Sequence, residues 1–239
     1  MNPPVSLAAL LMFLPFILPA SLAQTPTSPS QPAQASNDLG QFLVAAHQEN
    51  GLHEPNGEPW HVRATWQMLT SDGKTSEQGT WEEWWAGPHQ WEQTFGSPNL
   101  QQTYWDTPKG TFALNNHGVS DWIYVLIAQM VGNPIKLARD PASIPLRAIT
   151  FRKSHVALNC LIPKNFSRNP MVSEYCFDTG RHDLRMKIMP SVQITLNSIV
   201  KFEGRYLARE IDVARIGMPT IKIHLDVIDE PYPSGRVHG

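Results

Sequence analysis

Apolar side chains recur at every second position through most of this chain, and short turn sequences separate these runs. In the segment 60–68, for example, Trp60, Val62 and Trp66 alternate with polar residues. A period of two is typical of a strand with one buried and one solvated face. The run ends at Ser71-Asp72-Gly73-Lys74, a sequence that favours a tight hairpin turn. The pattern therefore predicts antiparallel strands joined by short turns.

Similar patterns predict further strands along the rest of the chain. Five strands in a meander are expected between Trp60 and Asn115, four more between Leu146 and Met189, and two or three longer ones between Val192 and Val227. Helical spacing appears in Val119–Val131, and Leu39–Gly51 is a candidate opening helix. A sheet of about ten or eleven strands with so few helices must curl. We expect a mainly β protein, a highly curved antiparallel half-barrel with one or more helices covering its concave face.

The N-terminal segment indicates export. The first 37 residues contain no Asp, Glu, Lys or Arg, and Leu7 to Ala23 are mostly apolar. Small residues at Ser21 and Ala23 are typical of a secretory signal cleaved before Gln24. An uncleaved anchor is the alternative, but the run is short for a bilayer span and two prolines interrupt it. We expect a periplasmic or secreted protein with no stable transmembrane span once the signal is removed.

Composition divides the chain into four parts: a signal (1–23), a linker rich in Pro, Ser and Gln (24–37), one β-rich domain (38–230) and a tail (231–239). The formal net charge of -2 excludes the basic surface expected of a nucleic-acid-binding protein.

Two cysteines lie on consecutive predicted strands, at Cys160 and Cys176. In an exported protein such a pair favours a structural disulfide, because the spacing is too wide for a redox motif.

No motif specifies a reaction. Asp178-Thr179-Gly180 matches the triplet of aspartic proteases, but it occurs once and is also a common turn sequence. Glu82 and Glu83 are adjacent on a predicted strand, so they face opposite sides. The histidines on the predicted strands and loops are scattered singly: His61, His89, His117, His155, His182 and His224. We expect no catalytic site, metal or cofactor; an enzyme would require Asp178, His182 and Glu83 to converge in one pocket.

Aromatic residues are concentrated in one part of the chain, since all eight tryptophans lie between Trp60 and Trp122. These rings either fill a core beneath the helix predicted at Val119–Val131 or line an apolar cleft that binds acyl chains or hydrophobic peptides. The candidate ligand-binding residues are Trp60, Trp66, Trp81, Trp85, Trp91, Phe95, Tyr104, Trp122 and Leu126.

The run from Gly79 to Trp91, the following Ser97-Pro98-Asn99-Leu100 turn and the Lys109-Gly110 hairpin resemble strands two to four of the LolA/LolB-like half-barrel proteins. Tyr175-Cys176-Phe177-Asp178 also resembles a segment of secreted bacterial proteins described as TonB-type. The LolA-like resemblance implies a periplasmic carrier of lipids or lipidated proteins that performs no catalysis. One departure is that Gln24 stands where LolB-like members carry a lipidated cysteine.

Together these observations predict an exported protein that binds a hydrophobic ligand or a lipidated protein in an aromatic cleft, with the helix at Val119–Val131 as a movable cover. The alternative is an interaction module that offers a sheet edge or surface patch to another envelope protein and holds no small ligand.

Overall fold

The computed structural model describes residues 31–54, 57–115, 122–137, 145–153, 156–164 and 173–229. The chain divides into two units, Met1–Gln31 and Pro32–Gly239, and the described elements belong to the second apart from the first residue of α1. In chain order these elements are α1 (Gln31–Glu49), β1 (Trp60–Leu69), β2 (Thr75–Gly87), β3 (Gln90–Ser97), β4 (Leu100–Thr107), β5 (Gly110–Asn115), α2 (Trp122–Gly132), β6 (Leu146–Lys153), β7 (Val156–Pro163), β8 (Glu174–Asp178), β9 (Leu184–Met189), β10 (Val192–Phe202), β11 (Arg205–Arg215) and β12 (Thr220–Asp229).

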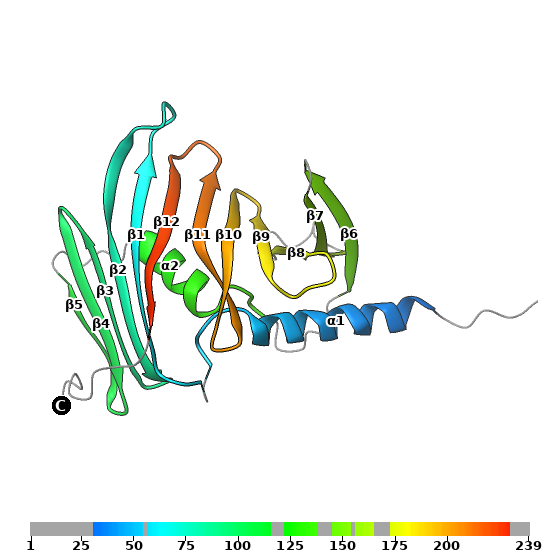
Figure 1. Cartoon of the computed structure of the whole chain (residues 1–239), viewed down its shortest axis with the longest axis horizontal. Coiled ribbons are helices and arrows are strands. Elements are labelled where there is room, and N and C mark those ends of the chain that lie inside the picture. Colours follow the sequence, from blue (N-terminus) through cyan, green and yellow to red (C-terminus); the bar gives the residue numbers. More distant parts are fainter. Residues whose placement is uncertain are drawn as a thin grey trace, which may run out of the picture. The chain divides into compact units, whose positions relative to one another are not determined.

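The strands form one antiparallel sheet of twelve strands in the order β5-β4-β3-β2-β1-β12-β11-β10-β9-β8-β7-β6 (Figure 1). The predicted fold class is confirmed, with twelve strands where the sequence predicted ten or eleven. The five-strand meander is confirmed too, because β1 to β5 are consecutive in the sheet. The last strand, β12, returns to pair with β1, and among the described residues no pairing joins the end strands β5 and β6.

The alternation along β1 shows how the sequence selects the buried face. Trp60, Val62, Ala64 and Trp66 are buried, whereas Arg63, Thr65 and Gln67 are exposed. The buried residues join one large hydrophobic core that also contains the apolar side chains of α2. This core lies on one face of the sheet, and Figure 1 shows α2 beside the central strands.

A glycine in β2 makes room for a tryptophan of this core. Gly79 pairs with Trp66 of β1, and on its other side the carbonyl of Gly96 in β3 lies close to it. A Cβ atom at Gly79 would lie 2.0 Å from the Gly96 carbonyl oxygen and 2.7 Å from the Trp66 ring. The absence of a side chain at Gly79 therefore lets the indole lie flat over the neighbouring strand.

Helix α1 begins at Gln31, before the predicted start at Leu39, so residues 31–37 of the segment predicted as a linker are helical. Pro32 lies in the first turn, where a helix needs no backbone N–H donor. The helix contributes Leu43 and Ala46 to the core, and the Phe42 ring meets the Phe177 ring edge-on at 5.2 Å. Residues 1–30, with the predicted signal, and the tail from 230 onward lie outside the described residues.

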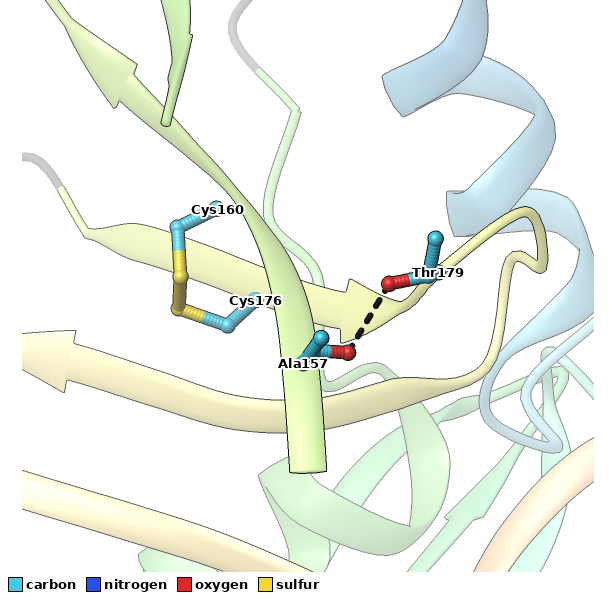
Figure 2. The surroundings of a disulfide bond; sticks show 4 residues. All are labelled: Ala157, Cys160, Cys176 and Thr179. Carbon is cyan, nitrogen blue, oxygen red and sulfur yellow. Dashed lines mark hydrogen bonds between the residues drawn. A yellow bond between two sulfur atoms is a disulfide. The ribbon is translucent and has the colours of Figure 1, made fainter. Parts of the chain in front are cut away.

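The predicted disulfide is confirmed. Cys160 on β7 and Cys176 on β8 are directly paired across the two strands and are bonded to each other (Figure 2). Together with Leu158, Ile162 and Met186 they form a second, smaller hydrophobic cluster. At the end of β8, Thr179 donates a hydrogen bond from its hydroxyl to the Ala157 carbonyl at 2.9 Å. The Asp178-Thr179-Gly180 triplet is thus a strand end and turn.

Candidate functional site

The aromatic residues of β1, β2 and β3 form a continuous surface under α2. Trp66 and Phe95 stack in parallel with ring centroids 5.4 Å apart, and Trp60 and Trp85 stack at 6.1 Å. The residues of α2 that cover this surface are buried: Ile123, Leu126, Ile127, Met130, Val131 and Gly132. In this arrangement the helix and the rings are packed against each other.

The candidate ligand-binding residues differ in how deeply they lie. Five are 0–6% exposed: Trp60, Trp66, Trp81, Trp85 and Phe95. Leu126 of α2 is 9% exposed, and Trp91 and Tyr104 are half-buried. Trp122, at the start of α2, is 38% exposed, and the Arg215 guanidinium lies 5.9 Å from its ring centroid. The structure therefore brings all but Trp122 into the layer between the sheet and α2, with Trp122 at one end of the helix.

A polar network is buried within this apolar layer. Glu83 of β2 is fully buried, and its Oε1 accepts hydrogen bonds from His53 Nε2 at 2.8 Å and from Gln93 Nε2 at 2.6 Å. The Tyr124 hydroxyl of α2 donates to Gln93 Oε1 at 2.5 Å. A chain of four side chains thus links the segment before β1, two strands and the covering helix.

The charges in this network depend on one another. Burial lowers the pKa of His53, but the Glu83 charge and its hydrogen bond outweigh burial, so the pKa of His53 is raised above its usual value. Burial, with the nearby Glu83 charge, raises the pKa of Tyr124, so its hydroxyl remains a hydrogen-bond donor over the physiological range. Glu83 Oε2 is buried and has no hydrogen-bond partner among the described residues.

Backbone contacts set the position of His53. The Leu52 and His53 N–H groups donate to the Val131 and Gly132 carbonyls at the end of α2, each at 3.0 Å. A Cβ atom at Gly132 would lie 2.2 Å from the His53 ring, so the glycine leaves space for the imidazole. The ring also stacks on Trp85, with the centroids 4.4 Å apart.

Sequence reasoning missed His53 as part of a site. It lies between α1 and β1, where no period predicts burial, and its partner Glu83 is distant in sequence. The alternation of β2 did place Glu83 on the same face as Trp81 and Trp85, and a carboxylate on a buried face requires a partner. The buried position of Glu83 was therefore the one feature of the sequence that could have predicted this network.

An enzyme would require Asp178, His182 and Glu83 to converge in one pocket, and these three residues lie apart. Glu83 belongs to the network under α2, whereas His182 pairs with Glu49 of α1 at 2.9 Å. Asp178 faces Arg185 at 3.6 Å. His61, His89 and His224 are paired with separate carboxylates along the sheet, and His117 and His155 lie outside the described residues. Within the described ranges no three His, Cys, Asp or Glu side chains form a metal-binding group.

A lysine near the C-terminal end of α2 is also buried. Lys187 of β9 is 1% exposed, and its Nζ donates to the Pro134 carbonyl at 3.0 Å, just after α2 ends. Burial, together with the nearby Lys136 charge, lowers the pKa of Lys187 to about 8. The ammonium group binds a carbonyl at the C-terminal end of the helix, where a positive charge is favourable.

No protein-family model matches this chain, and no curated protein matches it. Solved structures with a similar fold include a putative outer membrane lipoprotein-sorting protein domain from Vibrio parahaemolyticus, with 7% identity over 82% of this chain and 92% of that one, and a TM-score of 0.48. A DUF1329 family protein from Desulfovibrio piger has 10% identity over 86% and 95% of the two chains, with a TM-score of 0.49. A LolA superfamily protein from Nitrosomonas europaea has 6% identity over 82% and 95%, with a TM-score of 0.49.

Identities of 6 to 10% concern the arrangement of the strands and helices and do not identify a ligand. Of the helices in the described segments, none combines the length and apolar character needed to cross a membrane.

Proposed function

We propose that this protein is exported to the cell envelope and binds a hydrophobic ligand, a lipid or the acyl chain of a lipoprotein, without catalysis. The ligand enters between α2 and the aromatic face of the sheet when α2 moves away. The observation that carries the proposal is the composition of α2: it has no charged residue, buries one side on the rings and leaves Trp122 and Val125 exposed.

Few polar contacts hold α2 in place. In the described segments they include the Tyr124–Gln93 hydrogen bond, the two backbone bonds from Leu52 and His53, and the Lys187 contact just beyond the helix. An acyl chain in place of α2 would restore apolar contact with the rings, at about 25 cal/mol per Å2 of apolar surface removed from water. Trp60, Trp66, Trp81 and the other candidate residues would then line the ligand.

The proposed compartment rests on two features of this chain. The apolar segment Leu7–Ala23 is typical of a secretory signal, and the Cys160–Cys176 disulfide is suited to an oxidising compartment such as the periplasm. A carrier in that compartment would meet lipids or lipidated proteins as partners.

A second candidate function is an interaction module with no small ligand. The edge strand β5 favours it, because Phe112 and Leu114 there are 44% and 68% exposed. An edge strand with exposed apolar side chains can pair with a strand of another protein.

Replacing Tyr124 by phenylalanine tests the movement of α2. The change removes the hydrogen bond to Gln93 and keeps the ring, which stacks on Tyr104 at 4.7 Å. A net loss of about 1 kcal/mol from the closed state raises the open fraction, and so the apparent affinity, about fivefold. Titration with the fluorescent probe N-phenyl-1-naphthylamine measures this affinity, and native mass spectrometry of protein from the periplasm detects a bound lipid.

Tyr206→Phe is the matched control, because Tyr206 lies on β11, where its ring is near Lys201 and Arg181. Unchanged probe affinity in Tyr124→Phe, with both variants folded, would argue against opening at α2. If Trp66→Ala and Trp91→Ala lower stability but leave probe affinity intact, the rings are core and do not line the ligand.

A further inference from the structure

A pocket of about 280 Å3 lies near one end of the sheet. Five apolar residues line it: Phe151, Val156, Leu158, Met186 and Leu196. Phe151 on β6 and Val156 on β7 remain 40% and 48% exposed. The pocket therefore leaves apolar surface in contact with water.

Strand register shows that this pocket opens on the face of the sheet away from the helices. Leu158 lies two positions from Cys160, and Met186 pairs with Cys176, so both point to the side of the disulfide. Both belong to the smaller hydrophobic cluster, whereas α1 and α2 pack on the larger core. Leu196 is the exception, because it belongs to the larger core, so the pocket lies against the edge of that core while Leu158 and Met186 face the opposite side.

The pocket lies where strands β9 and β10 separate. The pairing of β9 with β10 covers only Val192 to Thr195 of β10, so β10 continues without β9 beyond that point. The polar groups of the lining come from Arg185, which lies just beyond the segment of β9 that pairs with β10, and from Thr195 and Asn197 of β10.

Arg185 is the charged residue that lines the pocket, and Asp178 is its acidic neighbour. Arg185 Nη1 lies 3.6 Å from Asp178 Oδ2, too far for a hydrogen bond, and both side chains are partly exposed. Arg147 and Arg152 are exposed on β6, and the charge of Arg147 is opposed by Glu174. The guanidinium therefore has N–H donors available for a carboxylate beside an apolar pocket.

From these features we infer that the pocket binds the anion of a medium-chain fatty acid, with the acyl chain among Phe151, Leu158 and Met186 and the carboxylate on Arg185. Its volume is near the lower end of ligand pockets, about 300–1,000 Å3, which favours a short chain over a whole phospholipid. This is a second site, distinct from the one proposed under α2.

Calorimetric titration with octanoate tests the pocket. Val156→Trp fills it from its exposed rim and is expected to weaken octanoate binding about tenfold or more. Ile149→Trp is the matched control, because Ile149 is 41% exposed on the neighbouring strand β6 but does not line the pocket. Unchanged octanoate affinity in Val156→Trp, or no binding by the wild-type protein at about 1 mM, would overturn the inference.

Arg185→Gln tests the anionic part of the inference. The variant is expected to weaken octanoate about fivefold to tenfold and to leave the neutral analogue 1-octanol unchanged, since only the carboxylate uses the guanidinium. Equal effects on both compounds would overturn the role of the charge. Octanoate binding that is strengthened by Tyr124→Phe but insensitive to Val156→Trp would place the ligand under α2; that result would support the proposed function and overturn this second site.

Discussion

Replacing Glu83 by alanine is expected to lower the free energy of unfolding by about 3 to 4 kcal/mol at pH 6, measured by urea denaturation. The change removes a carboxylate that accepts hydrogen bonds from His53 and Gln93, and it leaves both donors without that partner in a mostly apolar layer. Breaking a buried ion pair from one side typically costs about 3–5 kcal/mol. Glu83 is fully buried, so solvent does not screen its interactions.

The stabilisation from this pair depends on pH in a direction that the structure determines. The pKa of His53 is raised in the folded state, so the folded protein holds this proton more tightly than the unfolded chain. The contribution is therefore complete below the unfolded value of about 6.5 and is lost as the pH rises through the higher folded value. In Glu83→Gln, which keeps the size but not the charge, this fall in stability above about pH 6.5 is expected to disappear.

Glu82 provides the matched control for both measurements. It is the neighbouring residue on the opposite face of β2, it also pairs with a histidine, His61, at 2.7 Å, and it is 30% exposed. Because solvent reaches this pair, Glu82→Ala is expected to cost at most about 1 kcal/mol. Equal losses from Glu82→Ala and Glu83→Ala would show that the buried network contributes nothing specific.

Much of the fold could be predicted because strand burial depends on alternation and turn chemistry, which are local. The predicted strands Glu174–Asp178 and Leu184–Met189 have the bounds found in β8 and β9. The helix predicted at Val119–Val131 corresponds to α2, of which Trp122–Gly132 is described. Gly132, expected only to stop the helix, also leaves space for His53.

The site was less predictable because it depends on contacts between segments distant in sequence. Glu83 and His53 meet only when the segment before β1 bonds to the end of α2, and no local pattern predicts that contact. Lys187 is similar: a lysine in a strand ordinarily faces water, and here it donates a hydrogen bond to the carbonyl of Pro134. Register, which alternation alone does not determine, decides which rings stack on which.

The buried network also bears on the proposed movement of α2. A polar network within an apolar layer costs stability unless its members are satisfied, and it allows few alternative packings. Tyr124 is the member that belongs to α2, and its only hydrogen bond in the network is to Gln93. If α2 pivots about its C-terminal end, where Leu52 and His53 bond to it, opening would break the Tyr124–Gln93 hydrogen bond and leave the His53–Glu83 pair in place. Exposing the aromatic face of the sheet would then cost the Tyr124 hydrogen bond but not the ion pair that stabilises the sheet.

Removing the disulfide by the double change Cys160→Ala and Cys176→Ala is expected to lower the free energy of unfolding by about 3 kcal/mol, or the melting temperature by about 6–12 °C. The bond joins residues 16 positions apart and limits the freedom of the unfolded chain between them. It also lies at the centre of the smaller cluster, whose apolar partners Leu158 and Met186 remain in the variant. Scanning calorimetry of the variant and of oxidised and reduced wild-type protein measures the difference.

Reduced wild-type protein is the control, because it loses the bond but keeps both sulfur atoms, and its melting temperature should fall between the other two. Equal melting temperatures for the variant and the oxidised protein would contradict a stabilising disulfide and would remove one of the two supports for an oxidising compartment.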